Sequence, residues 1–197
     1  MTNTAQDAAQ AILPIIYTTV LQDGVPYVTV SHSVGTLIQY ELLSLMRERG
    51  MKMPSHVFVS SFPHPDIEPS LRPWKVNATL DDAAFKQECR DWDTNEIIFS
   101  VNLWPGLEPL MRADFTIFDQ YEYKRAGEPR FDFPITAFVA KKDKKVTREM
   151  VDGWRRFTSA AFRLHEIDGH HLFPISVPPA KKVWLQTIVD AIESIEK

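Results

Sequence analysis

The chain is poor in cysteine, with Cys89 the single one among its 197 residues. One cysteine excludes an internal disulfide, and scarce cysteine is typical of a protein kept in a reducing compartment. No segment approaches the ~20 apolar residues that a membrane-spanning helix needs. The polar start of the chain also lacks the basic flank and apolar run of a secretory signal. These absences predict a cytoplasmic protein with no membrane contact.

The chain also lacks an excess of positive charge. Its 22 basic and 26 acidic residues give a formal net charge of −4 at pH 7. Without a basic field to hold a polyanion, nucleic acid is not an expected partner. The content of 44% hydrophobic and 24% charged residues is that of an ordinary globular protein, and we expect a single domain over residues 1–197.

Four short runs of β-branched and aromatic residues predict buried strands at 25–30, 56–61, 135–140 and 162–167. Helical patterns alternate with these strands, at 36–50, at 147–159 and from Pro178 onward. Strands separated by helices pair in parallel through right-handed crossovers. The sequence therefore predicts an α/β fold with a mostly parallel sheet and flanking helices.

Residues 69–130 interrupt this alternation with a segment that has no clear parallel strand. The segment is rich in aromatic residues: Trp74, Phe85, Trp92, Phe99, Trp104, Phe115, Phe118, Tyr121 and Tyr123. A long insertion in such a sheet is usually functional or disordered, and this aromatic content argues against disorder. We interpret it as a small helical lid. In a second, compatible interpretation the aromatic side chains simply pack the segment onto the body.

The most informative motif is V-S-H-S-V-G at residues 30–35, between the first predicted strand and the amphipathic helix 36–50. It is a relaxed G-x-S-x-G nucleophile elbow around Ser33, with Ser31 in place of the first glycine. Ser31 and Gly35 must be small so that the helix can pack against the strand while the Ser33 hydroxyl projects. In the alternative interpretation, Ser33 only caps the helix at a strand-to-helix turn.

A serine hydroxyl becomes a nucleophile when an imidazole takes its proton and a carboxylate orients that imidazole. Asp143 follows the predicted strand 135–140, and His170 and His171 follow the strand 162–167. The order serine, aspartate, histidine is that of the α/β-hydrolases. Both histidines remain candidates from their position alone.

A metal site is the other interpretation of the same histidine-rich stretch. His165, Asp168, His170 and His171 are suitable ligand types. Their pattern, H-E-I-D-G-H-H, matches no recognised ligand spacing. We therefore expect neither a metal nor another cofactor.

Five segments, in the same order, resemble the type II thioesterases that serve polyketide and nonribosomal peptide synthases. The segments are SHSVGTLIQYELLSLMRERG, HVFVSSFPHP, LMRADFTIFDQYEY, FPITAFVAKKDKKVT and DGHHLF. They resemble the family's G-H-S-x-G-A elbow and helix, its next strand and loop, its L-R-A-D-F segment, its P-I-x-A-x-x-G-x-x-D-x-x-V strand and acid loop, and its G-G-H-F-F. The resemblance covers the chain from about residue 5 to about residue 175 and implies a shortened α/β-hydrolase fold with a helical lid.

The resemblance implies a role for each matching position. Ser33 would be the nucleophile, Asp143 the acid and His171 the base, because His171 precedes two apolar residues as the family's histidine does. The main-chain N–H of Val34, at the start of the helix, would donate to the oxyanion. The implied substrate is an acyl thioester on a phosphopantetheine carrier protein or on CoA. His170 occupies a position that is usually small in the family.

Two departures from the family leave alternatives open. The family has further strands before the elbow and a glycine-rich loop that gives a second oxyanion donor, and no such segment precedes the elbow here. If the chain is complete, residues 26–30 form a sheet edge that the N-terminal segment covers or that pairs in a homodimer. The alternatives are a general carboxylesterase with the same triad, or an impaired homologue that binds a carrier protein or another subunit.

The second departure is the set of lysines around Asp143, namely Lys141, Lys142, Lys144 and Lys145. Neighbouring cations favour an ionised carboxylate, which suits an acid that orients a histidine. These lysines would also suit the phosphate of phosphopantetheine or an acidic carrier protein. The alternative is a solvated basic loop without a ligand.

Overall fold

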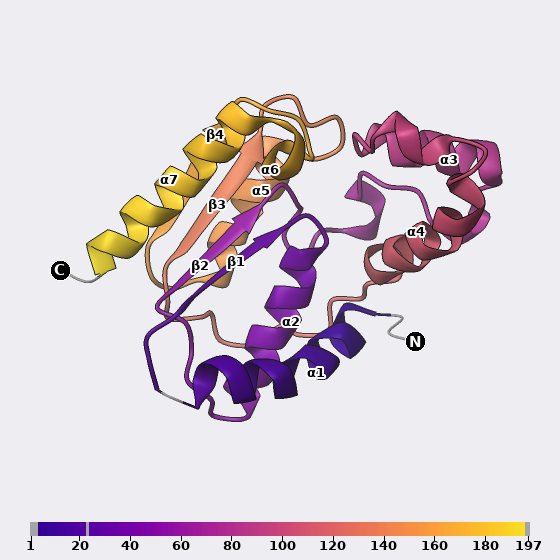
Figure 1. The fold of residues 1–197 in the computed structure, drawn as a ribbon. Coiled ribbons are helices and arrows are strands. Elements are labelled where there is room, and N and C mark those ends of the chain that lie inside the picture. The colour runs from indigo at the N-terminus through magenta and orange to yellow at the C-terminus, as the bar shows by residue number, and fades with distance from the viewer. Residues whose placement is uncertain (1–3, 23, 196–197) are drawn as a thin grey trace.

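A computed structural model describes residues 4–22 and 24–195. In this part of the chain, four parallel strands form a sheet in the order β1-β2-β3-β4 (Figure 1). The strands are β1 Val28–His32, β2 His56–Ser60, β3 Ile135–Ala140 and β4 Phe162–Ile167. The predicted α/β class, with a mostly parallel sheet, is confirmed.

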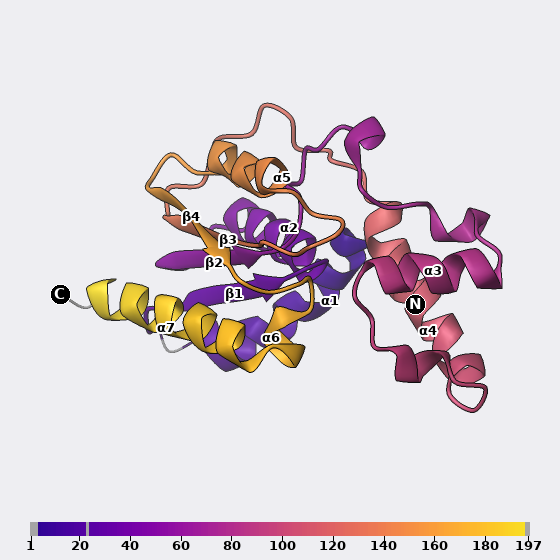
Figure 2. The ribbon, with the colours of Figure 1, turned by 90° about the horizontal axis from the view of Figure 1, so that it is seen from above.

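Helices cover both faces of this sheet, and two further helices, α3 Asp82–Asp91 and α4 Trp104–Asp119, lie beside it (Figure 1). The others are α1 Ala5–Ile16, α2 Gly35–Glu48, α5 Arg148–Asp152, α6 Phe173–Ser176 and α7 Pro178–Ile195. Viewed from above, α2 and α5 cover one face of the sheet, and α7 covers the other (Figure 2). None of the helices in the described residues is long and apolar enough to span a membrane.

The two central strands show why the sheet is buried on both faces. Successive side chains of a strand point to opposite faces. Val57 and Val59 of β2 belong to the core beneath α2, whereas Phe58 packs with Phe138 and with Trp184 of α7. Every residue of β2 and of β3 is buried. Continuous apolar runs of this kind are typical of parallel strands.

The first strand is displaced from its predicted position. The prediction was 25–30, but β1 extends to His32, which pairs in register with Ser60 of β2. The ladder is made by main-chain groups, so it continues through Ser31 although the apolar pattern ends before it. β1 is an edge strand of the four-stranded sheet, and pairing of this edge in a homodimer stays a prediction.

The helix predicted at 147–159 is wrong in its second half. Thr147 caps α5 as a helix start should be capped, since its side chain accepts the N–H of Met150. The chain then tightens into a 3-10 helix at Gly153–Phe157. A Cβ on Gly153 would lie 1.9 Å from the ring of His64, so that ring packs directly on the main chain. This tertiary contact has no signal in the local sequence.

The N-terminal helix α1 packs against α2 through its small residues. Its buried residues are Ala5, Ala8, Ala9 and Leu13, whereas Ile15 is 62% exposed. Ile15 therefore lies outside the face that packs against α2.

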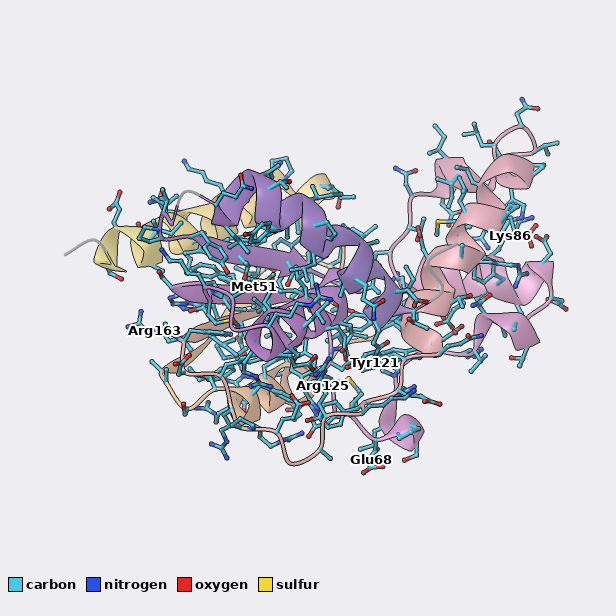
Figure 3. All side chains as sticks on the ribbon, turned by 90° about the horizontal axis from the view of Figure 1, so that it is seen from below. Met51, Glu68, Lys86, Tyr121, Arg125 and Arg163 are labelled. Carbon is cyan, nitrogen blue, oxygen red and sulfur yellow. The ribbon has the colours of Figure 1, made fainter. Side chains whose placement is uncertain are left out.

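Residues 69–130 leave the body between β2 and β3 and carry α3 and α4 (Figure 1). Phe85, Trp104 and Phe115 are buried there, and the Phe85 ring meets that of Trp104 at a tilt (centroids 5.9 Å apart) and that of Phe115 edge to face (5.2 Å). Figure 3 shows Tyr121 and Arg125 at the base of this insertion and Lys86 at its far end. The segment is helical and aromatic, and its action as a lid stays a prediction.

Candidate active site

Ser33 sits on a strained turn between β1 and α2. Its φ angle is +54°, in the left-handed region that L-residues seldom adopt. Two main-chain hydrogen bonds fix the turn, from the N–H of Ser33 to the oxygen of Ser60 (2.9 Å) and from the N–H of Thr36 to the oxygen of Ser33 (2.9 Å). This is the geometry of a nucleophile elbow, in which the serine hydroxyl projects beyond the end of the sheet.

The two small residues that flank the turn face each other as the motif predicts. A Cβ added to Gly35 would lie 3.9 Å from the Cβ of Ser31, which is an ordinary contact. The elbow therefore has room for the side chain of Ser31, whose hydroxyl donates to the main-chain oxygen of Phe58 at 3.3 Å. A serine at this position is compatible with the turn.

The structure brings Ser33, His171 and Asp143 together in one hydrogen-bonded chain. Ser33 Oγ lies 2.8 Å from Nε2 of His171, and Nδ1 of the same ring lies 2.7 Å from Oδ2 of Asp143. A carboxylate only accepts, so Nδ1 carries the proton and Nε2 is left free to accept from the serine. Both His171 and Asp143 are buried. The arrangement can move a proton from a serine hydroxyl to an imidazole.

Asp143 is held by its own loop. Its second oxygen, Oδ1, accepts the main-chain N–H groups of Lys145 and Val146, each at 3.0 Å. These two bonds leave Oδ2 to face the imidazole of His171. The carboxylate is thus oriented before any substrate is present.

The adjacent histidine has different partners. Nδ1 of His170 accepts the N–H of Leu172 at 3.3 Å, and Nε2 lies 3.1 Å from Oγ of Ser176. Its ring therefore bonds to residues at both ends of the short helix α6 and makes no hydrogen bond with Ser33. Of the two histidines, it is His171 that the fold places between the serine and the aspartate.

His32, the last residue of β1, packs against the imidazole of His171. Nδ1 of His32 is 2.7 Å from Oγ of Ser60, and its ring centroid is 5.3 Å from that of His171. Burial, and then the nearby His171, lower the pKa of His32 to about 3. A neutral ring at this position adds no positive charge beside His171, where an imidazolium would form.

The start of α2 supplies main-chain donors near the serine. Val34 directly precedes the helix, and the N–H groups at a helix start have no acceptor within the helix itself. They also lie at the positive end of the helix dipole. The N–H of Val34 is therefore in a suitable place to meet a negatively charged oxygen.

The four lysines around Asp143 are paired with carboxylates. Their Nζ atoms face Glu166 for Lys141 (3.7 Å), Asp168 for Lys142 (2.8 Å), Asp93 for Lys144 (2.7 Å) and Glu88 for Lys145 (2.8 Å). The first three side chains are more than half exposed, and the fourth is 12% exposed. Each lysine is thus paired with a carboxylate while three of the four stay in contact with solvent, and a phosphate or carrier-protein ligand for this loop stays a prediction.

Two residues that the motifs did not identify reach the site from the insertion. The Trp92 ring meets the His171 ring edge to face, with centroids 4.7 Å apart. Asp93 accepts the main-chain N–H of His171 through Oδ2 at 3.0 Å. Neither residue lies in one of the motifs. Asp93 is 78 residues before His171 in the sequence, so no local pattern indicates that the two are in contact.

A serine on a strained turn after one parallel strand, bonded to a histidine and an aspartate that come after later strands, defines the α/β-hydrolase class. A family model described as the Thioesterase domain matches residues 2–192. The chain belongs to this family. The family predicted from the sequence is thereby confirmed.

Individual relatives agree with this assignment. The chain is 34% identical to the gramicidin S biosynthesis protein GrsT of Aneurinibacillus migulanus, over 84% of this chain and 60% of GrsT. It is 30% identical to the linear gramicidin dehydrogenase LgrE of Brevibacillus parabrevis, over 85% of this chain and 61% of LgrE. The chain thus spans less than two thirds of the length of either relative.

A solved structure shows the same fold. It is RedJ, the thioesterase from the prodiginine biosynthetic pathway in Streptomyces coelicolor. RedJ is 28% identical to this chain and superposes with a TM-score of 0.79, over 94% of this chain and 67% of RedJ.

Proposed function

We propose that the chain is a serine thioesterase in which Ser33 is the nucleophile, His171 the general base and Asp143 the orienting acid. The observation that carries the proposal is the unbroken chain of hydrogen bonds from Ser33 Oγ through both nitrogens of His171 to Asp143 Oδ2. Three residues that lie far apart in the sequence form this contact because parallel strands end at one edge of a sheet. Membership of the thioesterase family supports the choice of bond cleaved.

In the first half of the reaction, Nε2 of His171 takes the proton of Ser33 as Oγ attacks the thioester carbonyl carbon. Asp143 stabilises the imidazolium, and the N–H of Val34 donates to the carbonyl oxygen as it becomes negative. The carbon–sulfur bond then breaks. The thiolate leaves with the proton that His171 carries, and the acyl group stays on Ser33 as an oxygen ester.

In the second half, water takes the place of the thiol. His171 removes a proton from the water, the hydroxide attacks the acyl carbonyl, and the bond to Ser33 Oγ breaks as His171 returns the proton to the serine. The product is a carboxylic acid. No cofactor is needed for either half.

The proposed substrate is an acyl group held as a thioester on the phosphopantetheine arm of a carrier protein, or on CoA. The relatives support this class through the processes in their names, gramicidin S biosynthesis for GrsT and prodiginine biosynthesis for RedJ. The alternative of a general carboxylesterase uses the same triad. A higher kcat/KM for a thioester than for its oxygen-ester analogue separates the two.

The test is covalent labelling with a fluorophosphonate, paired with hydrolysis of an acyl-CoA and an acylated carrier protein. The wild type should react and Ser33→Ala should not. Ser61→Ala is the matched control, because Ser61 also has a positive φ, +50°, just after β2. Equal labelling and equal hydrolysis by wild type and Ser33→Ala would contradict the proposal.

A further inference from the structure

The insertion touches both loops of the triad through a short stretch at the end of α3, residues 88–93. We propose that Asp93, within this stretch, is a positioning residue that holds His171 and the Asp143 loop in place for proton transfer. The inference rests on the proposed function for its effect on rate. Its structural part, the tethering of His171, stands on the contacts alone.

Asp93 joins the two loops with a single carboxylate. Oδ2 accepts the main-chain N–H of His171 at 3.0 Å, and Oδ1 lies 2.7 Å from Nζ of Lys144, the residue after Asp143. Oδ2 is also 3.6 Å from Nδ1 of His170. The carboxylate is 10% exposed, and its bond to Lys144 raises the pKa of that lysine. A hydrogen bond to a charged acceptor in such a site is stronger than a neutral one.

The end of α3 turns the carboxylate of Asp93 back toward the body. The φ angle of Asp93 is +59°, a conformation that asparagine, aspartate and glycine adopt more readily than other residues do. The residue is part of a Schellman motif that ends the helix, in which the N–H of Thr94 donates to the oxygen of Cys89 (3.2 Å) and the N–H of Asp93 to the oxygen of Arg90 (2.9 Å). This helix end brings the carboxylate to the main-chain N–H of His171.

A second anchor fixes the same stretch to the acid loop. Both oxygens of the buried Glu88 contact Nζ of Lys145, at 2.8 and 3.0 Å, and the indole N–H of Trp92 donates to Glu88 at 3.2 Å. The main-chain N–H of Lys145 in turn donates to Asp143. Glu88 therefore holds the end of α3 against the Asp143 loop, and Asp93, five residues further on, bonds to the main chain of His171.

The consequence is that the insertion takes part in positioning the catalytic base. The distance from His171 Nε2 to Ser33 Oγ depends on where the His171 main chain lies, and Asp93 is bonded to that main chain. A shift of the insertion that withdraws Asp93 frees the His171 loop to move. Displacements of about 1 Å in a reacting group can lower a rate by about 100-fold.

The test compares variants of Asp93 that keep its backbone conformation. Asp93→Gly removes the carboxylate, and glycine adopts the positive φ of this position without strain. Asp93→Asn keeps an oxygen that can accept the His171 N–H but loses the charge. Lys144→Ala removes the cation of the ion pair, whose side chain is 59% exposed and also donates to the main-chain oxygen of Arg90 at 3.4 Å. The matched control is Glu96→Ala, since Glu96 belongs to the insertion and pairs with Arg90 away from the triad.

With an acyl-CoA as substrate, kcat of Asp93→Gly should fall by about 10- to 100-fold at an unchanged KM, because the base is displaced and substrate binding is not. Asp93→Asn and Lys144→Ala should each stay within about threefold of wild type, because both keep an acceptor for the His171 N–H and lose only a pair whose cation is exposed to solvent. Glu96→Ala should match the wild type. A wild-type kcat in Asp93→Gly, or an equal loss in Asp93→Gly and Asp93→Asn, would overturn the inference.

A second readout does not depend on activity. Nδ1 of His171 lies 2.7 Å from Oδ2 of Asp143, and the NMR signal of the proton on Nδ1 should broaden or move in Asp93→Gly and remain in place in Asp93→Asn and Glu96→Ala. An unchanged signal in a folded Asp93→Gly protein would contradict the tethering. Inactive wild-type protein would contradict the proposed function alone, because the NMR comparison still decides the role of Asp93.

Discussion

The parallel sheet and the helical insertion hold the candidate active site by different means. The sheet places Ser33, Asp143 and His171 just beyond the ends of β1, β3 and β4, where main-chain ladders and a buried core determine the positions. The insertion acts through a few side chains, chiefly Asp93 and Glu88. The sheet therefore determines where the three residues lie, whereas a single substitution in the insertion can remove one of its contacts to their loops.

The largest effect should come from the histidine that the sheet positions. His171→Ala removes the base and should lower fluorophosphonate labelling and thioester hydrolysis by at least about 10³-fold. His170→Ala is the matched control, because His170 bonds to Ser176 and Leu172 instead of Ser33. Its rates should stay close to those of wild type. A greater loss in His170→Ala than in His171→Ala would overturn the assignment of the base.

The next effect concerns how the insertion is fixed to the body. Lys145→Met leaves the fully buried carboxylate of Glu88 without its cation, and breaking a buried pair costs about 3 to 5 kcal/mol of the free energy of unfolding. The matched control is Lys142→Met, whose pair with Asp168 is largely exposed and should matter by less than about 1 kcal/mol. Urea unfolding measures both. Equal stability of the two variants would show that the insertion is not anchored through Glu88.

A smaller effect is the pH dependence of the free energy of unfolding that comes from histidines. It belongs to the body of the protein, because the insertion contains no histidine between residues 69 and 130. Burial lowers the pKa of His32 to about 3 and that of His56 to about 4, from 6.5. Between pH 6.5 and 4 the unfolded chain binds protons that the folded body does not. The free energy of unfolding should therefore fall as the pH falls, by at most about 1.4 kcal/mol per pH unit for each group.

Urea unfolding of His56→Gln at pH 7 and at pH 4.5 measures this contribution. The variant should lose less stability than wild type between the two pH values. His170→Gln is the control, since a third of the His170 side chain is exposed. Parallel losses in wild type and His56→Gln would contradict a buried neutral His56.

The sheet could be predicted from the sequence because its signals are local. β3 and β4 have their predicted bounds, since β3 is a continuous apolar run and β4 alternates Phe162 and Leu164 with polar residues. The order of Ser33, Asp143 and His171 was also informative, because the loops at the carboxyl ends of parallel strands meet at one edge of the sheet. The choice of His171 over His170 needed the family resemblance, since a turn decides which ring faces inward.

The contacts of the insertion could not be predicted in the same way. Asp93 meets His171 across 78 residues of sequence, and Glu88 meets Lys145 across 57. No period or motif marks such pairs, because they depend on how two packed layers come together. The early end of α5 has the same origin, in the ring of His64 against Gly153.

The most direct test of the account is to trap the acyl-enzyme. The wild type is mixed with an acyl-CoA, quenched in acid within the first turnovers and digested, and the peptides are analysed by mass spectrometry. The account predicts the acyl mass on Ser33, absent in Ser33→Ala and in His171→Ala. Thioester hydrolysis that proceeds with no acyl group on Ser33, or with the acyl group on another residue, would contradict it.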